Sequence, residues 1–272
     1  EEGCTWGTFD YSQQEPRLVA HYALRFGYDS AETLASSYEN DPSTDFHQIV
    51  ADMAKIDRKE AKTISLGMFY GMGKAKLMAE LGVTKEKTDE LFTQYHNNAP
   101  FVKLLLNGVM EAAQERGKIK TLLGRRCRFP KYEPILRGSD WGKFVPAEDH
   151  ERMMELKNMG PHLLDEDGEV IKEKDGQPKK NYWYKNGHRR AFTYKALNKL
   201  IQGSAADMTK KAMVDLYKEG LLAHIQIHDE LDFSIQSKEQ SNKIKQIMEN
   251  AVDLKVPNKV DYESGPSWGE IK

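Results

Sequence analysis

The sequence predicts a protein of mixed α and β structure, with strands near both ends and a block of helices between them. Residues 5–12 (TWGTFDYS) are rich in the aromatic and β-branched side chains that favour strands. Residues 222–235 (LAHIQIHDELDFSI) place alternating apolar side chains on either side of a turn, as in a hairpin. Residues 46–117 instead carry apolar side chains at helical spacing.

Bulk composition excludes several classes of protein. The 272 residues are 39% hydrophobic and 30% charged, which suits a globular protein with a real core. Cys4 and Cys127 form neither a metal-binding spacing nor a disulfide framework, so a reducing compartment is expected. No apolar run approaches the length of a membrane span and no signal peptide is evident, so no membrane partner is expected. The net charge of −2 gives no overall nucleic-acid signal.

The first strand leads directly into a helix. It ends near Asp10, and a helix with Pro16 in its first turn follows. A carboxylate at the end of a buried strand is well placed to bind a metal ion. The alternative for Asp10 is a helix cap, for which Ser12 is the better candidate.

The central stretch, residues 56–73 (IDRKEAKTISLGMFYGMG), predicts a helix that begins with a capping box of Asp57 and Glu60 and ends at the glycines. Arg58 and Lys62 lie in its first turns, where the helix dipole is already positive. Free backbone N–H groups, the dipole and two cations together suit a polyanion such as a triphosphate. The alternative is a surface helix with solvated basic residues.

The flanking segments extend the helical block and add basic stretches. Residues 40–43 predict a turn, residues 46–54 a short helix with His47, and residues 74–117 three more helices. Residues 116–131 contain seven Lys or Arg and no acid. This stretch, which includes Arg125 and Arg126, either binds a phosphate backbone or is a solvated basic edge.

Residues 138–190 are irregular in pattern and suggest an exposed hairpin or insertion. Residues 179–195 (KKNYWYKNGHRRAFTYK) interleave basic and aromatic side chains without an acid. This mixture favours contact with a nucleic-acid strand, although it is also ordinary for a surface strand.

The C-terminal third predicts a long helix over residues 193–219 and then the hairpin. Asn198 and Gln202 share one face of the helix beside small residues, which suits either base edges or close helix packing. His228, Asp229 and Glu230 form the tip of the hairpin. Two adjacent acids there need a compensating charge if buried, and a divalent cation would supply it. Residues 237–254 predict an amphipathic helix, and the tail is extended.

Three signatures now stand in order: FDYSQQEPR at 9–17, R-x3-K-x7-YG at 58–71 and IHDE at 227–230. Together with QGSAAD at 202–207 and SGPSWGEIK at the C-terminus, they resemble motifs of the family A, polymerase I-like DNA polymerases, including the bacteriophage members. The resemblance runs along nearly the whole chain, and the complete ordered set is far more specific than any one motif.

The resemblance implies an α+β fold: a palm of antiparallel sheet and helices, and mostly helical fingers. Residues 1–27 and 191–272 would form the palm, and residues 28–190 the fingers, with an inserted irregular region near 131–189. The implied reaction is DNA-templated addition of deoxynucleotides to a primer 3′ end in replication, in the cytoplasm of a bacterium or a phage-infected host. The partners would be primer–template DNA and deoxynucleoside triphosphates.

The resemblance also implies roles for individual residues. Asp10 and Asp229 would bind two Mg²⁺ ions, Glu230 would lie beside the primer end, and Lys62 would protonate the leaving group. The residues that face the nucleotide would be Gln13, Glu15, His47, Arg58, Lys62, Leu66 and Tyr70. The residues that face DNA would be Asn198, Gln202 and His228, with Arg125 and Arg126 from the basic stretch.

The chain departs from the family pattern in several places. Leu66 replaces a common Phe or Tyr, Tyr194 replaces an Arg of the bacterial members, and the region 131–189 is longer than theirs. Only nine residues precede Asp10, so we expect a C-terminal palm and fingers portion that works with an upstream thumb, palm or exonuclease segment, and a strand around Asp10 with an unpaired edge.

Two alternatives remain open at this point. One is a single-subunit RNA polymerase, whose central helix looks alike, although the HDE sequence and Glu15 favour DNA. The other is a non-catalytic nucleic-acid-binding fragment that needs an upstream half.

Overall fold

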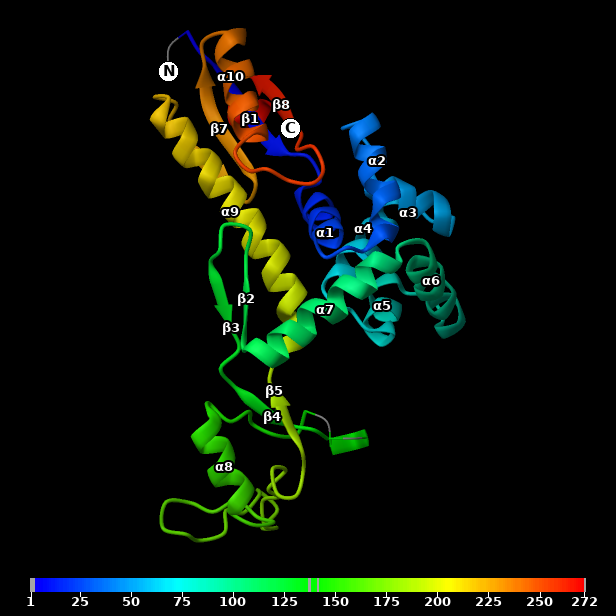
Figure 1. Cartoon of the computed structure of the whole chain (residues 1–272), viewed down its shortest axis with the longest axis vertical. Coiled ribbons are helices and arrows are strands. Elements are labelled where there is room, and N and C mark those ends of the chain that lie inside the picture. Colours follow the sequence, from blue (N-terminus) through cyan, green and yellow to red (C-terminus); the bar gives the residue numbers. More distant parts are fainter. Residues whose placement is uncertain (1–2, 137, 141, 272) are drawn as a thin grey trace. The chain divides into compact units, whose positions relative to one another are not determined.

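The computed structural model describes residues 3–136, 138–140 and 142–271 and confirms the α+β class (Figure 1). The chain forms two compact units. The first comprises Glu1–Gly108, Lys120–Arg125 and Leu197–Lys272, and the second comprises Val109–Ile119 and Arg126–Ala196. These units do not follow the palm and fingers boundaries predicted from the sequence, which stay a prediction.

A four-stranded antiparallel sheet forms the β part of the first unit, in the order β6-β7-β1-β8. Figure 1 labels β7, β1 and β8 of this sheet. Its strands are β1 (Thr5–Tyr11), β6 (Ile225–Ile227), β7 (Glu230–Ile235) and β8 (Val260–Gly265). The predicted hairpin is β6 and β7. The expectation that the strand of Asp10 has an unpaired edge is wrong, because β8 pairs along the side of β1 that β7 leaves open.

One face of this sheet is apolar and packs under α10 (Lys238–Glu249). The Phe9 ring meets Phe233 edge-on with centroids 5.5 Å apart and lies 4.7 Å from Tyr262. The Tyr11 hydroxyl donates a hydrogen bond of 2.7 Å to the Met248 carbonyl of α10. Because successive side chains of a strand alternate between faces, Asp10 projects from the opposite face to Phe9 and Tyr11.

The helix α1 (Gln14–Arg25) begins immediately after β1. Its N-cap is Gln13, whose φ of 50° lies in the left-handed region and whose side chain makes no capping bond. Ser12 is therefore not the cap that the sequence suggested, since the chain turns one residue later.

A buried guanidinium fastens the start of α1 to two distant segments. Arg17 donates hydrogen bonds to the carbonyls of Ser12 at 2.8 Å, Pro42 at 2.5 Å and Pro257 at 2.5 Å. Its guanidinium carbon also lies 4.3 Å from the centre of the Tyr38 ring. A buried charge needs such partners, and here they hold three loops together.

The predicted helical block is present, and one helix in it was not predicted. The helices are α2 (Glu32–Asn40), α3 (Phe46–Ala54), α4 (Arg58–Phe69), α5 (Lys74–Leu81), α6 (Lys85–Asn98) and α7 (Pro100–Arg116), with a short 3-10 turn η1 (Asp29–Ala31) before α2. The unpredicted helix is α2, whose polar sequence buries only Leu34, Ala35 and Tyr38. Within the described residues, no helix combines the length and apolar character needed to cross a membrane.

The capping box of α4 forms as predicted. The Glu60 N–H donates to Asp57 Oδ1 at 2.8 Å, and the Asp57 N–H donates to Glu60 Oε2 at 3.3 Å. The helix ends at Phe69, whose ring stacks on Phe46 of α3 at 5.7 Å. Gly71, at φ 71°, provides the left-handed turn that follows.

The long helix α9 (Ala196–Lys218) follows a 3-10 turn η3 (Thr193–Lys195). Its Ser204 hydroxyl bonds the Tyr22 hydroxyl at 2.7 Å and accepts from the Leu122 N–H at 3.0 Å. The small residues predicted to allow close approach therefore lie at a packed position. A last 3-10 turn, η4 (Trp268–Glu270), follows β8.

The second unit is built on short strands. Two two-stranded ribbons pair β2 (Lys118–Lys120) with β3 (Arg126–Arg128) and β4 (Tyr132–Pro134) with β5 (His188–Arg190). The predicted exposed hairpins appear as isolated bridges, Leu164 with Val170 and Lys172 with Pro178. The 3-10 turn η2 (Gly138–Asp140) and the helix α8 (His150–Asn158) complete the unit.

The helix α8 was not predicted because its sequence, HERMMELKN, buries only Met153 and Leu156, too few to show a periodicity. These two side chains pack with Ala147 and Trp183 in a small core.

Replacing Gly7 with alanine should destabilise the sheet. A Cβ at this position would lie 2.6 Å from Ile235 Cγ1 and 3.0 Å from a ring carbon of Tyr262. Overpacking of this kind costs about 1–3 kcal/mol, so Gly7→Ala should lower the thermal midpoint. Gly269→Ala is the matched control, because nothing lies within 4 Å of its added Cβ. A Gly7→Ala protein as stable as that control would contradict the packing described here.

Candidate active site

The candidate site lies at one end of the sheet in the first unit. Asp10, near the end of β1, pairs in register with Glu230 of β7 and with Asp261 of β8. Directly opposed residues of antiparallel strands project from the same face. Asp229 occupies the turn between β6 and β7, immediately before Glu230. Four carboxylates therefore gather around the end of β1.

The turn that carries Asp229 has an uncommon backbone. His228 has φ 55°, in the left-handed region that non-glycine residues seldom occupy. The Gln226 amide donates to the His228 carbonyl at 3.1 Å and supports the turn. His228 is exposed at the tip and Asp229 is half-buried, whereas Glu230 is already the first residue of β7.

Two of these carboxylates, Asp10 and Asp229, have raised pKa values. Loss of hydration, followed by repulsion from Asp229, Glu230 and Asp261, raises the pKa of Asp10 to about 7. Burial also raises the pKa of Asp229. Carboxylates with raised pKa values are stabilised by any cation placed between them.

Lys62 is the cation of α4 that acts on this end of the sheet. Burial raises the pKa values of Asp10, Asp229 and Glu15, and the positive charge of Lys62 offsets part of that rise. The side chain is exposed, one helical turn beyond Arg58. The structure thus brings Lys62 within electrostatic reach of both predicted metal ligands.

Arg58 is held by an aspartate that sequence analysis missed. Its Nε lies 2.5 Å from Asp45 Oδ2, and half of its side chain (51%) remains exposed. The other oxygen of Asp45 accepts from the backbone N–H groups of His47 at 2.9 Å and Gln48 at 3.2 Å, which caps α3. One carboxylate therefore joins the N-terminal ends of α3 and α4. An Asp directly before a predicted helix was the available signal.

His47 lies in the first turn of α3 and is buried. Burial, with the nearby charges of Arg58 and Lys62, lowers its pKa to about 4, and Asp45 opposes the shift only in part. The imidazole is therefore neutral at pH 7, within electrostatic reach of Arg58 and Lys62 of α4.

The side-chain amide of Gln13 makes two hydrogen bonds to the backbone around the start of α3. Its Nε2 donates to the Thr44 carbonyl and its Oε1 accepts from the Phe46 N–H, each at 2.8 Å. These bonds connect the end of β1 to the helix that carries His47. That Gln13 faces a nucleotide stays a prediction.

Three predicted site residues, from α1, the end of α4 and α9, lie near one another. The Tyr70 hydroxyl is close enough to the Glu15 carboxylate and to the Gln202 amide for each to influence its pKa. Burial raises the pKa values of both Tyr70 and Glu15. Leu66 is half-buried on α4 one turn before Tyr70, and Asn198 is half-buried on α9 one turn before Gln202.

The two arginines predicted to bind DNA differ in their surroundings. Arg125 bonds α9, with its Nε 3.0 Å from Asp207 Oδ1 and its terminal nitrogen 2.6 Å from the Gly203 carbonyl. Arg126 is exposed on β3. Arg126 belongs to the second unit, so its predicted role is not tied to the geometry of this site.

Asp10 and Asp229 fit a Mg²⁺ ion that is bound by a few protein carboxylates and not by a full cage of protein ligands. Throughout the described part of the chain, no group of three or more His, Cys, Asp or Glu is arranged to enclose a metal ion. Mg²⁺ commonly takes only one or two carboxylates and completes its shell with water and substrate phosphates. A pair of carboxylates with raised pKa values, as at Asp10 and Asp229, suits that mode of binding.

Comparison with known proteins places these features in a family. The sequence model of DNA polymerase family A matches residues 1–270. The chain belongs to DNA polymerase family A. A DNA-directed DNA polymerase of Pseudomonas phage M6 is 34% identical in an alignment of 310 positions. The alignment covers 99% of this chain and 39% of the phage protein. DNA polymerase I of Geobacillus stearothermophilus is 29% identical, over 97% of this chain and 26% of that protein.

A solved structure is similar to this chain along its whole length. The POL domain of Pol1 from M. smegmatis, in complex with DNA primer-template and dNTP, matches all of this chain and 41% of that chain, with a TM-score of 0.67 and 25% identity. The chain therefore spans less than half the length of these relatives.

The lowered pKa of His47 predicts a pH-dependent contribution to stability. Folded His47 stays neutral down to about pH 4, whereas an unperturbed histidine titrates near 6.5. Its contribution is therefore complete above pH 6.5 and is lost as the pH falls to 4, by up to roughly 3 kcal/mol. As the pH falls from about 7.5 to about 4.5, the free energy of unfolding of His47→Gln, measured in urea, should rise relative to that of wild type.

The comparison with wild type isolates His47, because the raised carboxylates at the end of the sheet titrate in both proteins and act in the opposite direction. His150→Gln, at an exposed position on α8, is the control for replacing a histidine away from this site. A pH-independent difference between His47→Gln and wild type would show that His47 does not carry the lowered pKa.

Proposed function

We propose that this chain is the catalytic portion of a DNA polymerase that adds deoxynucleotides to a primer 3′ end in DNA replication, with two Mg²⁺ ions. The observation that carries the proposal is the gathering of Asp10 and Asp229 at the end of one sheet within reach of Lys62. Membership of family A supports it. The partners would be primer–template DNA, deoxynucleoside triphosphates and an upstream thumb and palm segment.

Asp10 and Asp229 would hold the metal ions. Bound Mg²⁺ would supply Lewis-acid activation of the primer hydroxyl and neutralise charge on the leaving pyrophosphate. Without a cation, the two carboxylates repel each other and Asp10 has a pKa of about 7. Glu230, opposite Asp10 in the sheet, would lie beside the primer end.

The N-terminal end of α4 would bind the triphosphate. Lys62, Arg58 and neutral His47 surround this end, where the helix dipole favours an anion. Lys62, which acts on both aspartates, would stabilise the leaving pyrophosphate and donate a proton to it. Arg58 would contribute through the exposed part of its guanidinium while Asp45 holds its Nε.

The remaining residues would select the sugar and hold the DNA. Glu15, which is near Tyr70, would crowd a ribose 2′-hydroxyl, and Leu66 would face the sugar from α4. Tyr70 would close over the nascent base pair. Gln13 would face the nucleotide. The residues on the DNA side would be Asn198, Gln202 and His228, with Arg125 and Arg126 on the phosphate backbone.

An RNA polymerase is the second candidate, and Glu15 argues against it, because a carboxylate at this position would crowd a ribose 2′-hydroxyl. The third candidate, a non-catalytic fragment, differs only in needing its upstream half for any chemistry. Both alternatives are separated from the proposal by the same assay.

The test is extension of a labelled primer with deoxy- or ribonucleotides, with and without an upstream palm-and-thumb polypeptide. We expect weak, deoxynucleotide-specific extension by the chain alone and a marked increase with the partner, because grip on the duplex depends on phosphate contacts. Asp229→Asn should abolish extension in both cases. Preference for ribonucleotides, or full activity in Asp229→Asn, would contradict the proposal. Processive synthesis by the isolated chain would remove the need for the upstream partner.

Lys62→Ala should reduce turnover far more than DNA affinity. Lys62 acts on Asp10 and Asp229, where negative charge develops, and a single preorganised donor of this kind is worth about 10²–10³ in rate. Single-turnover extension and anisotropy with labelled primer–template measure the two effects. Lys59→Ala removes a neighbouring exposed cation of the same helix and should change neither greatly. Equal losses of rate and affinity in Lys62→Ala would place Lys62 on the DNA instead.

Leu66→Phe should change how the sugar is selected. An aliphatic side chain at this half-buried position packs less closely on a ribose than a flat ring would. The ratio of deoxy- to dideoxynucleotide incorporation should therefore differ between Leu66→Phe and wild type. Leu66→Met, which conserves the volume, should keep the wild-type ratio. If the ratio is the same in all three proteins, Leu66 only packs in the helix.

A further inference from the structure

The loop before α3 brings one carboxylate, that of Asp45, to a cation of the proposed triphosphate site. Asp45 Oδ2 lies 2.5 Å from Arg58 Nε. Its Oδ1 accepts from the backbone N–H groups of His47 at 2.9 Å and Gln48 at 3.2 Å. The two oxygens therefore have separate tasks, because one caps α3 and the other holds the guanidinium of α4.

Asp45 is ionised at neutral pH although it is partly buried. Burial opposes its ionisation, but hydrogen bonds from Arg58 and from the backbone of Gln48 and His47, with the charge of Arg58, lower its pKa. An ionised donor and an ionised acceptor form a charge-assisted hydrogen bond, which is shorter and stronger than a neutral one. The contact is thus strong enough to limit the freedom of a long side chain.

The backbone that carries Asp45 is fixed from the end of β1. Gln13 donates to the Thr44 carbonyl and accepts from the Phe46 N–H, each at 2.8 Å, so it binds the chain on both sides of Asp45. Gln13 follows Asp10 by three residues. The position of the Asp45 carboxylate is therefore set by the same strand that positions Asp10.

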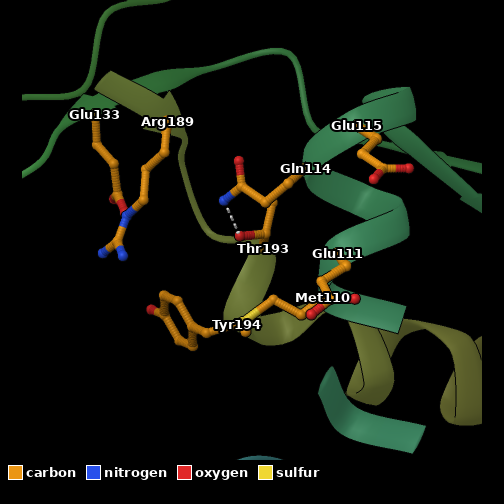
Figure 2. Close-up of a pocket in the computed structure, with 8 residues that line it drawn as sticks. All are labelled: Met110, Glu111, Gln114, Glu115, Glu133, Arg189, Thr193 and Tyr194. Atoms are coloured by element: carbon orange, nitrogen blue, oxygen red, sulfur yellow. Dashed lines mark hydrogen bonds and ion pairs between the residues drawn. The ribbon is translucent and has the colours of Figure 1, made fainter. Parts of the chain in front are cut away.

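The contact leaves part of the guanidinium available. Asp45 binds Arg58 through Nε, and 51% of the Arg58 side chain remains exposed. The two terminal nitrogens can then present a planar fork to a phosphate. Figure 2 shows the same form of contact in the second unit, where Glu133 holds Arg189 through Nε at 2.7 Å and the terminal nitrogens of Arg189 point away from the carboxylate.

Two effects of Asp45 on a triphosphate oppose each other. Its negative charge offsets part of the Arg58 charge and so weakens attraction for an anion, whereas its hydrogen bond orients the guanidinium. The charge effect is screened, because both side chains reach water, with 27% of the Asp45 side chain exposed. The orientation effect is not screened, since a misplaced binding group loses its geometry with the substrate. Orientation should therefore dominate.

We propose that Asp45 is a positioning residue that orients Arg58 towards the triphosphate of the incoming nucleotide. This role rests on the proposed polymerase function, which places a triphosphate at the N-terminal end of α4. Asp45 itself would make no bond to the nucleotide, because two anions repel each other. Lys62 does not depend on this contact, so the chemical step should be spared and nucleotide binding should be affected.

Asp45→Asn separates the two tasks of the side chain. Asn caps a helix as well as Asp does, but its amide nitrogen cannot accept a hydrogen bond from Arg58. In the primer-extension assay, the nucleotide concentration that half-saturates the rate should rise roughly tenfold, since a misplacement of about 1 Å can cost up to about 10²-fold. The maximal rate should be largely kept.

Asp149→Asn is the matched control. Asp149 caps α8 in the second unit, where its Oδ1 accepts from the Arg152 N–H at 2.9 Å. The same exchange at this cap should change neither the half-saturating concentration nor the maximal rate. Asp45→Ser, which keeps a capping oxygen and removes the carboxylate, is a second test variant and should behave like Asp45→Asn.

A double-variant cycle tests whether Asp45 acts through Arg58. Arg58→Ala alone should raise the half-saturating concentration, and adding Asp45→Asn should raise it little further. Losses that add in the double variant would overturn the positioning role, because Asp45 would then act on the nucleotide independently of Arg58.

The remaining outcomes separate this role from the polymerase function. An unchanged half-saturating concentration in Asp45→Asn and Asp45→Ser, with normal thermal midpoints, would overturn the positioning role and leave the polymerase function standing. A lowered concentration would also overturn it, since Asp45 would then compete with the triphosphate for Arg58. Failure of the wild-type chain to extend a primer, with or without the upstream polypeptide, would instead contradict the polymerase function and the positioning role with it.

Discussion

The pairing of β1 with both β7 and β8 is the constraint on which the candidate site depends. Its register places Asp10 opposite Glu230 and Asp261 and next to the turn of Asp229. A slip of one residue would turn Asp10 towards the apolar face. The packing of Phe9 against neighbouring rings opposes such a slip. The energy that holds the acidic end together therefore comes from the opposite, apolar face of the same sheet.

The helices reach this end of the sheet through a small number of polar contacts. Arg17 binds three carbonyls from separate segments, and Gln13 binds the loop before α3. Asp45 then joins α3 to Arg58 of α4. Gln13 follows Asp10 by three residues, and Asp45 lies in the loop that Gln13 binds. Hydrogen bonds therefore link the metal-binding end of the proposed site to its triphosphate-binding end, although 35 residues of sequence separate Asp10 from Asp45.

The sequence was a good guide wherever the signal was local. The capping box of Asp57 and Glu60, the helical block and the hairpin with Asp229 all follow from spacing and turn chemistry. The approach of Asp10 and Asp229 was implied only by the family resemblance, and the pairing of Asp10 with Asp261 was missed, because nothing in a strand tail marks Asp261 as a partner of Asp10. The helices α2 and α8 were missed because few of their residues are buried. The functional assignments came from the order of the motifs, not from any one residue.

The central claim is that Asp10 and Asp229 form one cation site. The most direct measurement is Mn²⁺ binding followed by electron paramagnetic resonance, with Mn²⁺ as the probe for Mg²⁺ because both prefer oxygen ligands. If the two carboxylates share the ion, Asp10→Asn and Asp229→Asn should each lose most of the wild-type affinity, and the double variant should lose little more. Additive losses, or unchanged affinity in either single variant, would show that the two aspartates act separately and would contradict the account.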